Sequence, residues 1–254
     1  MNFPHDKNSN SPVIVITGGT QGLGRALAET LLQGGFRVSF CARSSVDVEA
    51  AKAALQSISP VVAVSGDIND DTVQTRLVDE TVRAFGRIDG VVNNASTLGS
   101  LPLPVILQSS FENDRHVFAT NVLAPLQLLR KAVPILTRQS RSLILGISSD
   151  AAAGGYPGWG IYGASKAALD LLHKTMAAEL AADGVQVHSV DPGDMDTTMH
   201  HAADPGAQGL ASPATVARAL LPLFMPLLDS RSHPFATGTR LRVAGGVLEG
   251  ADLA

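Results

Sequence analysis

Tyr162 and Lys166, four residues apart, are the side chains whose spacing most clearly indicates chemistry. On a helix such positions share one face, so the phenol and the ammonium would be neighbours. A phenol with a pKa of about 10 transfers a proton poorly at neutral pH, but a nearby ammonium favours the phenolate. Ser149 ends an apolar run before Tyr162, and its hydroxyl could hold a substrate oxygen while Tyr162 protonates it. The three residues predict proton transfer to an oxygen atom.

A glycine-rich turn lies between the first apolar run and a helical pattern, with the sequence Thr17-Gly18-Gly19-Thr20-Gln21-Gly22-Leu23-Gly24. Its glycines let the backbone turn tightly and approach a pyrophosphate, and the following helix offers free N–H groups to the anion. We expect a dinucleotide to contact this turn through Gly18, Thr20, Gln21, Gly22, Leu23 and Gly24. For Gln21 two interpretations stay open, contact with a phosphate or ribose, or exposure to solvent.

The end of the second apolar run indicates which dinucleotide is bound. A site for NAD usually has an acidic residue there, which accepts hydrogen bonds from the ribose 2′-hydroxyl. Here Arg43 follows Ala42, and no Asp or Glu occurs before Asp47. A carboxylate would repel a 2′-phosphate, whereas the guanidinium of Arg43 can pair with it. The sequence therefore predicts NADP(H) as the cofactor.

The elements that must position these residues are short apolar runs separated by longer helical patterns. The runs are Val13–Thr17, Phe36–Ala42, Val61–Ser65, Ile88–Asn93, Leu143–Ser148, Val185–Val190 and Thr239–Val243. Most are apolar at consecutive positions, which is typical of parallel strands covered on both faces. Helical patterns include Leu23–Gln33, Val73–Phe85 and Ile161–Ala182. This alternation predicts an α/β fold, a doubly wound parallel sheet of about seven strands.

Composition sets the wider limits. The chain has 254 residues, 45% of them hydrophobic, which suits one domain over 13–254 behind a flexible N-terminal tail at 1–12. The net charge of −4 and the lack of a basic stripe argue against nucleic acid as a partner. The sequence has no apolar run of about 18 residues and no secretory signal, so we expect no membrane partner. Its single cysteine, Cys41, fits the cytoplasm. His200 and His201 lack further ligands at metal-binding spacing, so no metal is expected.

The motifs together resemble the short-chain dehydrogenase/reductase family, in its compact single-domain branch. The resemblance covers nearly all of the chain after Pro12. It rests on Thr17 to Gly24, Asp67-Ile68, Asn93-Asn94-Ala95, Asn121, Ser149, Tyr162 with Lys166, Pro192-Gly193 and Thr197. It implies a Rossmann fold and a hydride transfer between a nicotinamide and a carbonyl or alcohol.

The same resemblance implies roles for individual residues. Asp67 and Ile68 would contact the adenine, Asn93 and Ala95 would lie along the cofactor, and Pro192 and Gly193 would flank it. Asn121 would complete the catalytic group with Ser149, Tyr162 and Lys166, by anchoring a water that links Lys166 to solvent. Thr197 would bond the nicotinamide carboxamide.

A narrower resemblance concerns the sepiapterin and benzil reductases, which reduce carbonyls with NADPH. It rests on Asn93 to Gly99, Gly158-Trp159 and Asp196 to Met199. Arg242 occupies the approximate place of the aspartate that holds the pterin in sepiapterin reductase, which argues against a pterin substrate. Two further departures from the family pattern are Ser96, where glycine is usual, and Ala244, where aspartate is common.

The substrate side of the site is predicted from Trp159, Met195 and Met199, together with Ser149 and Tyr162. Trp159 either stacks on a substrate or packs in a core or an interface. The segment 194–212, with little bulk and no apolar period, is expected to be mobile and to close over the nicotinamide. The two methionines would line an adaptable apolar pocket for flat, aromatic carbonyls.

Three functions stay open on the sequence alone. The first is an NADPH-dependent carbonyl reductase, and the second is an alcohol dehydrogenase that uses the same residues in the oxidative direction. The third is a non-catalytic NADP(H)-binding regulator, which would have no need of the four catalytic residues together. Asn113–Leu136 carries apolar residues on more than one helical face, so a homodimer or homotetramer is expected.

Overall fold

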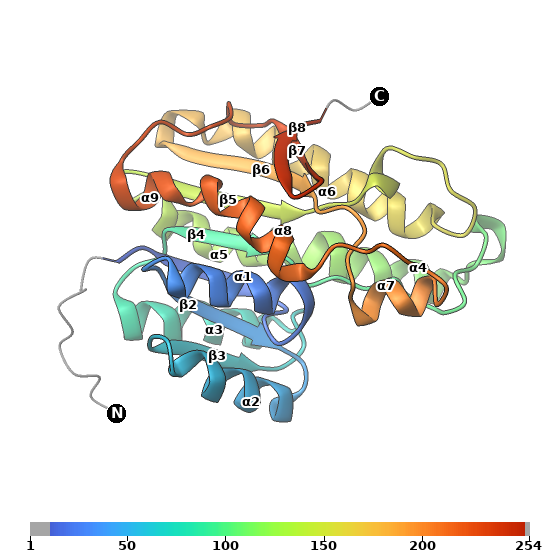
Figure 1. Cartoon of the computed structure of the whole chain (residues 1–254), viewed down its shortest axis with the longest axis horizontal. Coiled ribbons are helices and arrows are strands. Elements are labelled where there is room, and N and C mark those ends of the chain that lie inside the picture. The colour runs from blue at the N-terminus through green and yellow to red at the C-terminus, as the bar shows by residue number, and fades with distance from the viewer. Residues whose placement is uncertain (1–10, 252–254) are drawn as a thin grey trace.

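The computed structural model describes residues 11–251, and every strand in it joins one sheet (Figure 1). The strands are β1 Val13–Thr17, β2 Arg37–Ala42, β3 Val61–Ser65, β4 Gly90–Asn93, β5 Ser142–Ile147, β6 Val185–Asp191, β7 Arg240–Ala244 and β8 Val247–Gly250. Their order in the sheet is β3-β2-β1-β4-β5-β6-β7-β8. The chain crosses from β3 back to β4 beside β1, so the strand order reverses there, where α/β folds bind ligands.

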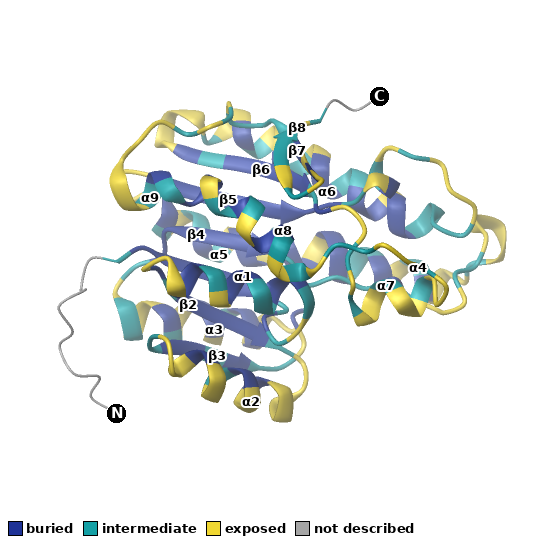
Figure 2. Cartoon of the chain, in the orientation of Figure 1, coloured by how far each residue is buried: buried dark blue, intermediate teal, exposed yellow. Residues whose placement is uncertain are grey.

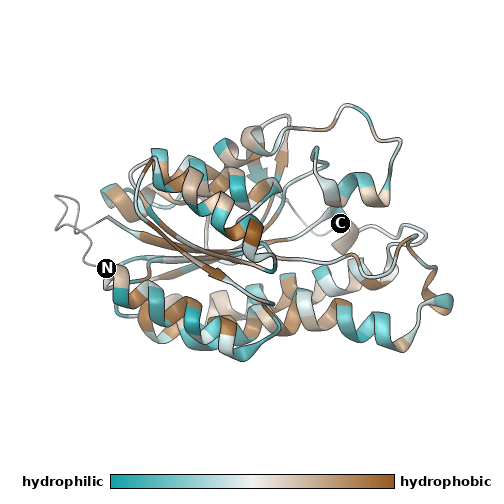
Figure 3. Ribbon diagram, turned by 90° about the horizontal axis from the view of Figure 1, so that it is seen from below, coloured by the Kyte–Doolittle hydropathy of each residue, from teal (hydrophilic) through white to brown (hydrophobic). Residues whose placement is uncertain are grey.

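The helices form two layers, one on each face of the sheet (Figure 3). They are α1 Gly22–Gln33, α2 Ser45–Gln56, α3 Asp71–Phe85, α4 Phe111–Phe118, α5 Ala124–Leu136, α6 Gly160–Glu179, α7 Thr198–Ala203, α8 Pro213–Leu220 and α9 Met225–Asp229. Helices α1, α2 and α8 share one apolar core with the sheet, and α3, α5 and α6 share the other. Ile14 and Ile16 face the first core and Val15 the second, so β1 is buried on both sides.

Burial follows the same division, with dark strands between helices whose outer faces are exposed (Figure 2). The predicted doubly wound fold is confirmed, since β1 to β7 run parallel. The expected number of strands was one too few. β8 pairs antiparallel with β7 through the turn Gly245-Gly246, whose φ angles of 57° and 78° suit a two-residue hairpin. Neither β8 nor the turn is buried, so no apolar run marks them.

Two helical predictions need correction. The long helix ends at Glu179 instead of Ala182, because Ala181–Asp183 forms a separate 3₁₀ turn. The helical region 113–136 is two helices, α4 and α5, joined by a π-helical turn at Ala119–Leu123. Most of the expected tail lies outside the described residues, and at Pro12 the backbone already accepts a hydrogen bond from Arg37.

Candidate active site

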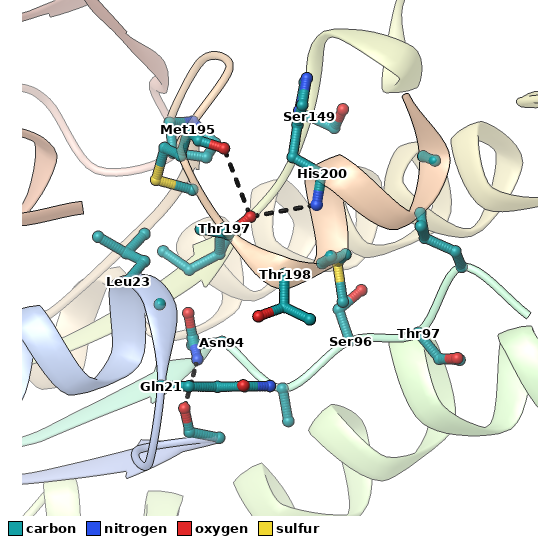
Figure 4. Close-up of a pocket in the computed structure, with 18 of the residues that line it drawn as sticks. Gln21, Leu23, Asn94, Ser96, Thr97, Ser149, Met195, Thr197, Thr198 and His200 are labelled. Atoms are coloured by element: carbon teal, nitrogen blue, oxygen red, sulfur yellow. Dashed lines mark hydrogen bonds between the residues drawn. The ribbon is translucent and has the colours of Figure 1, made fainter. Parts of the chain in front are cut away.

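A cavity of about 950 Å³ lies at the carboxyl ends of the parallel strands. The loops after β1 to β6 and the start of α6 line it, so residues far apart in the sequence meet there (Figure 4). Of the predicted site residues, the lining includes Gly18, Thr20, Gln21, Gly22, Leu23, Arg43, Asp67, Ile68, Ala95, Ser149, Trp159, Tyr162, Lys166, Pro192, Gly193, Met195, Thr197 and Met199. The predicted glycine-rich turn and the predicted proton donor therefore share one cavity.

The glycine-rich turn fits the phosphates of a dinucleotide. Gly18 and Gly22 have φ angles of 71° and 53°, which favour glycine. Helix α1 begins at Gly22 with no side chain capping its first N–H groups and no acid in its first turn. Other helices of this chain are capped by Ser44, Asp70, Ser110 and Ser212. The start of α1 thus keeps its donors free for an anion.

Three predicted residues do not line the cavity. Gly24 is buried, and a Cβ there would lie 2.3 Å from the Gly18 carbonyl oxygen, so this glycine allows close packing of α1 against the turn. Asn93 ends β4 and faces His173 on the far side, with 3.5 Å between Nδ2 and Nε2. The cavity is lined instead by Asn94, whose Nδ2 donates to the Thr17 and Gly18 carbonyls at 2.8 and 3.1 Å. The third is Asn121.

Asn121 lies in the π-helical turn, 1% exposed, directly behind the cavity wall. Its Oδ1 accepts hydrogen bonds from the Ser96 hydroxyl at 3.1 Å and from the Thr97 N–H at 2.9 Å. Its Nδ2 donates to the Thr97 carbonyl at 2.9 Å and to the Ser165 hydroxyl at 3.0 Å. Ser165 in turn donates to the Tyr162 carbonyl at 2.6 Å. Asn121 therefore ties the loop after β4 to the helix that carries Tyr162.

Arg43 follows β2 at the opposite end of the cavity and is exposed. The next residue, Ser44, caps α2 by accepting a hydrogen bond from the Asp47 N–H at 3.2 Å. Asp67 and Ile68 follow β3 in the adjacent loop, where Asp67 holds Asn69 at 2.9 Å. Arg43, Ser44 and Asp67 thus bring a guanidinium, a hydroxyl and a carboxylate to this end of the cavity.

Tyr162 and Lys166 lie side by side at the start of α6, as their spacing predicts. The Lys166 ammonium nitrogen is 5.5 Å from the centre of the Tyr162 ring and donates to the Ile147 carbonyl at 2.8 Å. Burial lowers the pKa of Lys166 to about 8, and the charge of Asp170 opposes this effect. Both side chains are buried, with exposed fractions of 8% and 2%.

The sequence predicts a lowered pKa for Tyr162, and this prediction is wrong for the structure. Burial raises that pKa above its usual value, and the hydroxyls of Ser96 and Ser149 only partly offset this. The cause is that desolvation of the phenolate outweighs the hydrogen bonds from the two neighbouring hydroxyls. Tyr162 thus keeps its proton at neutral pH.

Ser149 and Ser96 approach the Tyr162 hydroxyl from different strand ends. The Ser149 hydroxyl donates to Asp150 Oδ1 at 3.0 Å and accepts from the Ala151 N–H at 3.2 Å. Sequence reasoning missed Ser96 as a site residue, although its departure from the usual glycine was the available signal. Asn94 was also missed, because the sequence analysis placed the preceding residue, Asn93, along the cofactor. Tyr156 and His200 also line the cavity, and no motif marks them.

The segment 194–212 lines part of the cavity. Its two ends meet in a bridge between Met195 and Ala211, and α7 lies between them. Thr197 caps α7 by accepting a hydrogen bond from the His200 N–H at 3.2 Å, and it lies above the turn that carries Gln21 and Leu23 (Figure 4). The rings of Trp159 and Tyr162 meet edge to face at 5.7 Å and pack with Leu98, Leu103 and Ala203. This wall is apolar and aromatic.

Residues 11–251 contain no helix that is long and apolar enough to cross a membrane. Within the same range, no three His, Cys, Asp or Glu side chains are arranged to hold a metal ion.

Comparison with known proteins shows to which family this chain belongs. Residues 12–208 match the short chain dehydrogenase family. The chain is 32% identical to L-fucose dehydrogenase of Mus musculus, over 92% of this chain and 87% of that protein. It is also 32% identical to fluoren-9-ol dehydrogenase of Terrabacter sp., over 86% and 67%. The crystal structure of levodione reductase superposes with a TM-score of 0.82 at 25% identity, covering 92% of this chain and 96% of that one.

None of these three relatives is a sepiapterin or benzil reductase, so they do not support the narrower resemblance. They agree on the broader point, since all three are named for oxidoreductases. A match over most of the length, together with the shared fold, shows that this chain belongs to the short-chain dehydrogenases, oxidoreductases that act on alcohols or carbonyls with NAD(H) or NADP(H).

Proposed function

We propose that this protein is an NADPH-dependent carbonyl reductase. The observation that carries the proposal is the setting of Tyr162, a buried phenol that keeps its proton, faced by the hydroxyls of Ser149 and Ser96. A proton donor of this kind suits reduction, in which a carbonyl oxygen must take up a proton. The same cavity contains the glycine-rich turn at the start of α1.

The proposed mechanism assigns one task to each residue. Ser149 donates a hydrogen bond to the substrate oxygen, and Tyr162 transfers its hydroxyl proton to that oxygen as negative charge develops on it. The ammonium of Lys166 stabilises the resulting phenolate, which then takes a proton from water. A dinucleotide bound at the glycine-rich turn would supply the hydride that reduces the carbonyl carbon. Asn121 holds the loop that carries Ser96 against the helix that carries Tyr162 through its four hydrogen bonds.

The preference for NADP(H) over NAD(H) is proposed from Arg43. Its guanidinium lies at the cavity edge after β2, where a 2′-phosphate would be bound, and Ser44 adds a second polar group. We expect kcat/KM with NADPH to exceed that with NADH by at least about tenfold, modest for one charge-assisted contact. Arg43→Asp should abolish or reverse the preference. A wild-type protein that prefers NADH would contradict the assignment.

The proposed substrates are flat, apolar or aromatic ketones. The wall around Trp159 and Tyr162 is apolar and aromatic, and Met195 and Met199 add apolar surface to the same cavity. Two relatives support this choice by their names, which are fluoren-9-ol dehydrogenase and levodione reductase. L-fucose dehydrogenase supports the second candidate, oxidation of a neutral alcohol or sugar by the same residues.

The test is a screen that follows NADPH consumption with aromatic ketones, 1,2-diketones and aldehydes, and NADP⁺ reduction with fluoren-9-ol and L-fucose. Fast reduction of an aromatic ketone supports the proposal. A clear preference for oxidation of L-fucose would favour the second candidate. Binding of NADPH without turnover of any compound would favour the non-catalytic regulator.

We also propose that the protein assembles as a homodimer or homotetramer. Of the apolar residues in 113–136, Val117, Val122, Leu128, Leu129 and Leu136 are buried within the subunit, which weakens the sequence argument. Leu123 stays 56% exposed, and Phe111 at the start of α4 and Leu171 on α6 are exposed as well. Such side chains are expected at a subunit contact. A reducing compartment such as the cytoplasm suits Cys41, a buried thiol.

A further inference from the structure

A buried ion pair lies directly behind the proposed active site. Arg240 on β7 and Asp170 on α6 are joined by a contact of 3.0 Å between Nε and Oδ2, and their side chains are 11% and 6% exposed. Burying two charges is expensive, and apolar residues of similar size often serve stability as well or better. The pair therefore calls for an explanation other than stability.

Each partner holds one of two consecutive serines at the end of β5. Asp170 Oδ2 accepts a hydrogen bond from the Ser148 hydroxyl at 2.8 Å. Arg240 Nη2 donates to the Ser149 carbonyl at 2.8 Å. The pair thereby fixes the backbone that presents the Ser149 hydroxyl to the cavity, although neither Asp170 nor Arg240 lines the cavity itself.

Asp170 also shares a face of α6 with the catalytic lysine, Lys166, four residues earlier. The second oxygen of Asp170, Oδ1, is buried with no hydrogen-bond partner among the described residues. Burial lowers the pKa of Lys166 to about 8, and Asp170 acts against that change. The other charged or titratable groups around this lysine are Tyr162 and His173 on α6, Arg240 from β7, and Asp150 and Asp191, which act on Tyr162.

We propose that Asp170 and Arg240 are positioning residues for the reaction, with Arg240 holding Ser149 in place and Asp170 supplying the anion that keeps Lys166 an ammonium. This inference rests on the proposed function and adds two residues to it. It assigns different tasks to the two partners, so their variants should behave differently. A purely structural ion pair would instead give the same loss for either partner.

The variants Asp170→Asn and Arg240→Met should change the pH dependence of kcat/KM in different ways. Asp170→Asn removes the anion and leaves the Arg240 charge unbalanced, so Lys166 should lose its proton at lower pH. The fall of kcat/KM at alkaline pH should then begin about one pH unit lower than in wild type, which is about a tenfold loss at pH values above the wild-type limb. Arg240→Met leaves the Asp170 charge unbalanced, so the alkaline limb of kcat/KM should stay at the wild-type pH or move to higher pH. Its kcat should fall about tenfold, because Ser149 loses its anchor.

Binding can be followed without turnover, since Trp159 is the only tryptophan and lines the cavity. Quenching of its fluorescence by NADPH, measured from neutral to alkaline pH, should weaken through the Lys166 pKa and do so earlier in Asp170→Asn. The control is Arg242→Met, on the same strand, which removes an exposed ion pair with Glu249 and should change neither limb nor kcat. If a single variant does not fold, the double variant Asp170→Asn with Arg240→Met leaves no unpaired buried charge. It should show both the lower limb and the lower kcat.

The outcomes separate the two levels of proposal. A wild-type protein that neither binds NADPH nor reduces any carbonyl would overturn the proposed function itself. An active wild type in which Asp170→Asn and Arg240→Met shift the alkaline limb in the same direction would overturn only the assignment of this pair. So would an active double variant with the wild-type limb and kcat.

Discussion

Ser96 stands where the family usually has glycine, and unlike the other departure, Ala244, it lines the cavity. Its hydroxyl donates to Asn121 Oδ1 at 3.1 Å and also acts on the Tyr162 hydroxyl, lowering its pKa. When Tyr162 has lost its proton, Ser96 can turn to donate to the phenolate, because Asn121 Oδ1 still has the Thr97 N–H at 2.9 Å. Ser96 thus offers a second donor to the charge that forms during reduction.

Replacing Ser96 by the usual glycine tests this role. Ser96→Gly should lower kcat for ketone reduction by about tenfold, the worth of one hydrogen bond to a charged group, with little change in NADPH affinity. Ser96→Thr keeps the hydroxyl and should retain most of the activity. The control is Ser100→Gly, in the same loop but outside the cavity lining. Equal kcat for Ser96→Gly and wild type would exclude the role.

At this scale the sequence predicts residue types better than their surroundings. Tyr162, Lys166 and Ser149 could be found from spacing alone, since helical and strand periodicity determine which of them meet. The raised pKa of Tyr162 could not, because it depends on burial by segments distant in the sequence. Asn93 and Asn94 show the same limit. Successive residues at a strand end face opposite ways, so only the three-dimensional structure tells which one reaches the cavity.

Among the elements, the segment from Asp194 to Ser212 bears most directly on turnover. The structure gives it a helix, α7, where the sequence has no apolar period, because Thr197 caps that helix and a bridge joins the segment's ends. A Cβ on Gly22 would lie 3.4 Å from the Thr197 side chain, so the segment reaches the glycine-rich turn. Opening and closing of this contact would control access to the cavity.

Hydrogen exchange tests that expectation. Amides of α7 should exchange faster in the free protein and become protected when NADP⁺ and a slowly reduced ketone are both present. Thr197→Val removes the cap, which is worth about 1 kcal/mol, and should weaken this protection and raise KM for the ketone. Thr197→Ser keeps a capping hydroxyl and is the matched control. Equal protection with and without ligands would mean that the segment is a fixed wall.

Element boundaries were predictable where a face is buried and not elsewhere. The strands β1 to β6 have consecutive buried residues and stand out in the sequence, whereas β7 alternates between buried and exposed positions. β8 is a short edge strand with no buried side chain, although the Gly245-Gly246 turn was a usable hairpin signal. The π-helical turn at Ala119–Leu123 cannot be read from apolar spacing, since it inserts extra backbone between two ordinary helices. It is also the turn that presents Asn121.

For the whole molecule, two buried histidines predict sensitivity to acid. Burial, with a contribution from the Lys166 charge, lowers the pKa of His173 to about 4, and burial lowers that of His188 to about 4. The unfolded chain binds these protons at higher pH than the folded one. Stability is therefore full above the unfolded pKa of about 6.5 and is lost as pH falls towards 4.

Urea unfolding at about pH 7 and about pH 5 measures this effect, which amounts to about 2 kcal/mol for each histidine at the lower pH. His188→Asn cannot titrate but keeps a donor for the Thr239 carbonyl, which His188 Nδ1 contacts at 3.1 Å. This variant should lose less stability on acidification than wild type. His116→Asn, at an exposed position, should match wild type. A free energy of unfolding that is the same at both pH values would refute the prediction.

Tyr162 is the proton donor in the proposed reduction of a carbonyl, and a comparison of wild type with Tyr162→Phe tests this role most directly. It measures kcat for NADPH-dependent reduction of an aromatic ketone by wild type and Tyr162→Phe, with NADPH affinity followed through Trp159 fluorescence. The variant keeps the ring that packs against Trp159 at 5.7 Å and removes only the hydroxyl. We predict a loss in kcat of about a hundredfold or more with affinity unchanged. Near-normal turnover by Tyr162→Phe would contradict the mechanism.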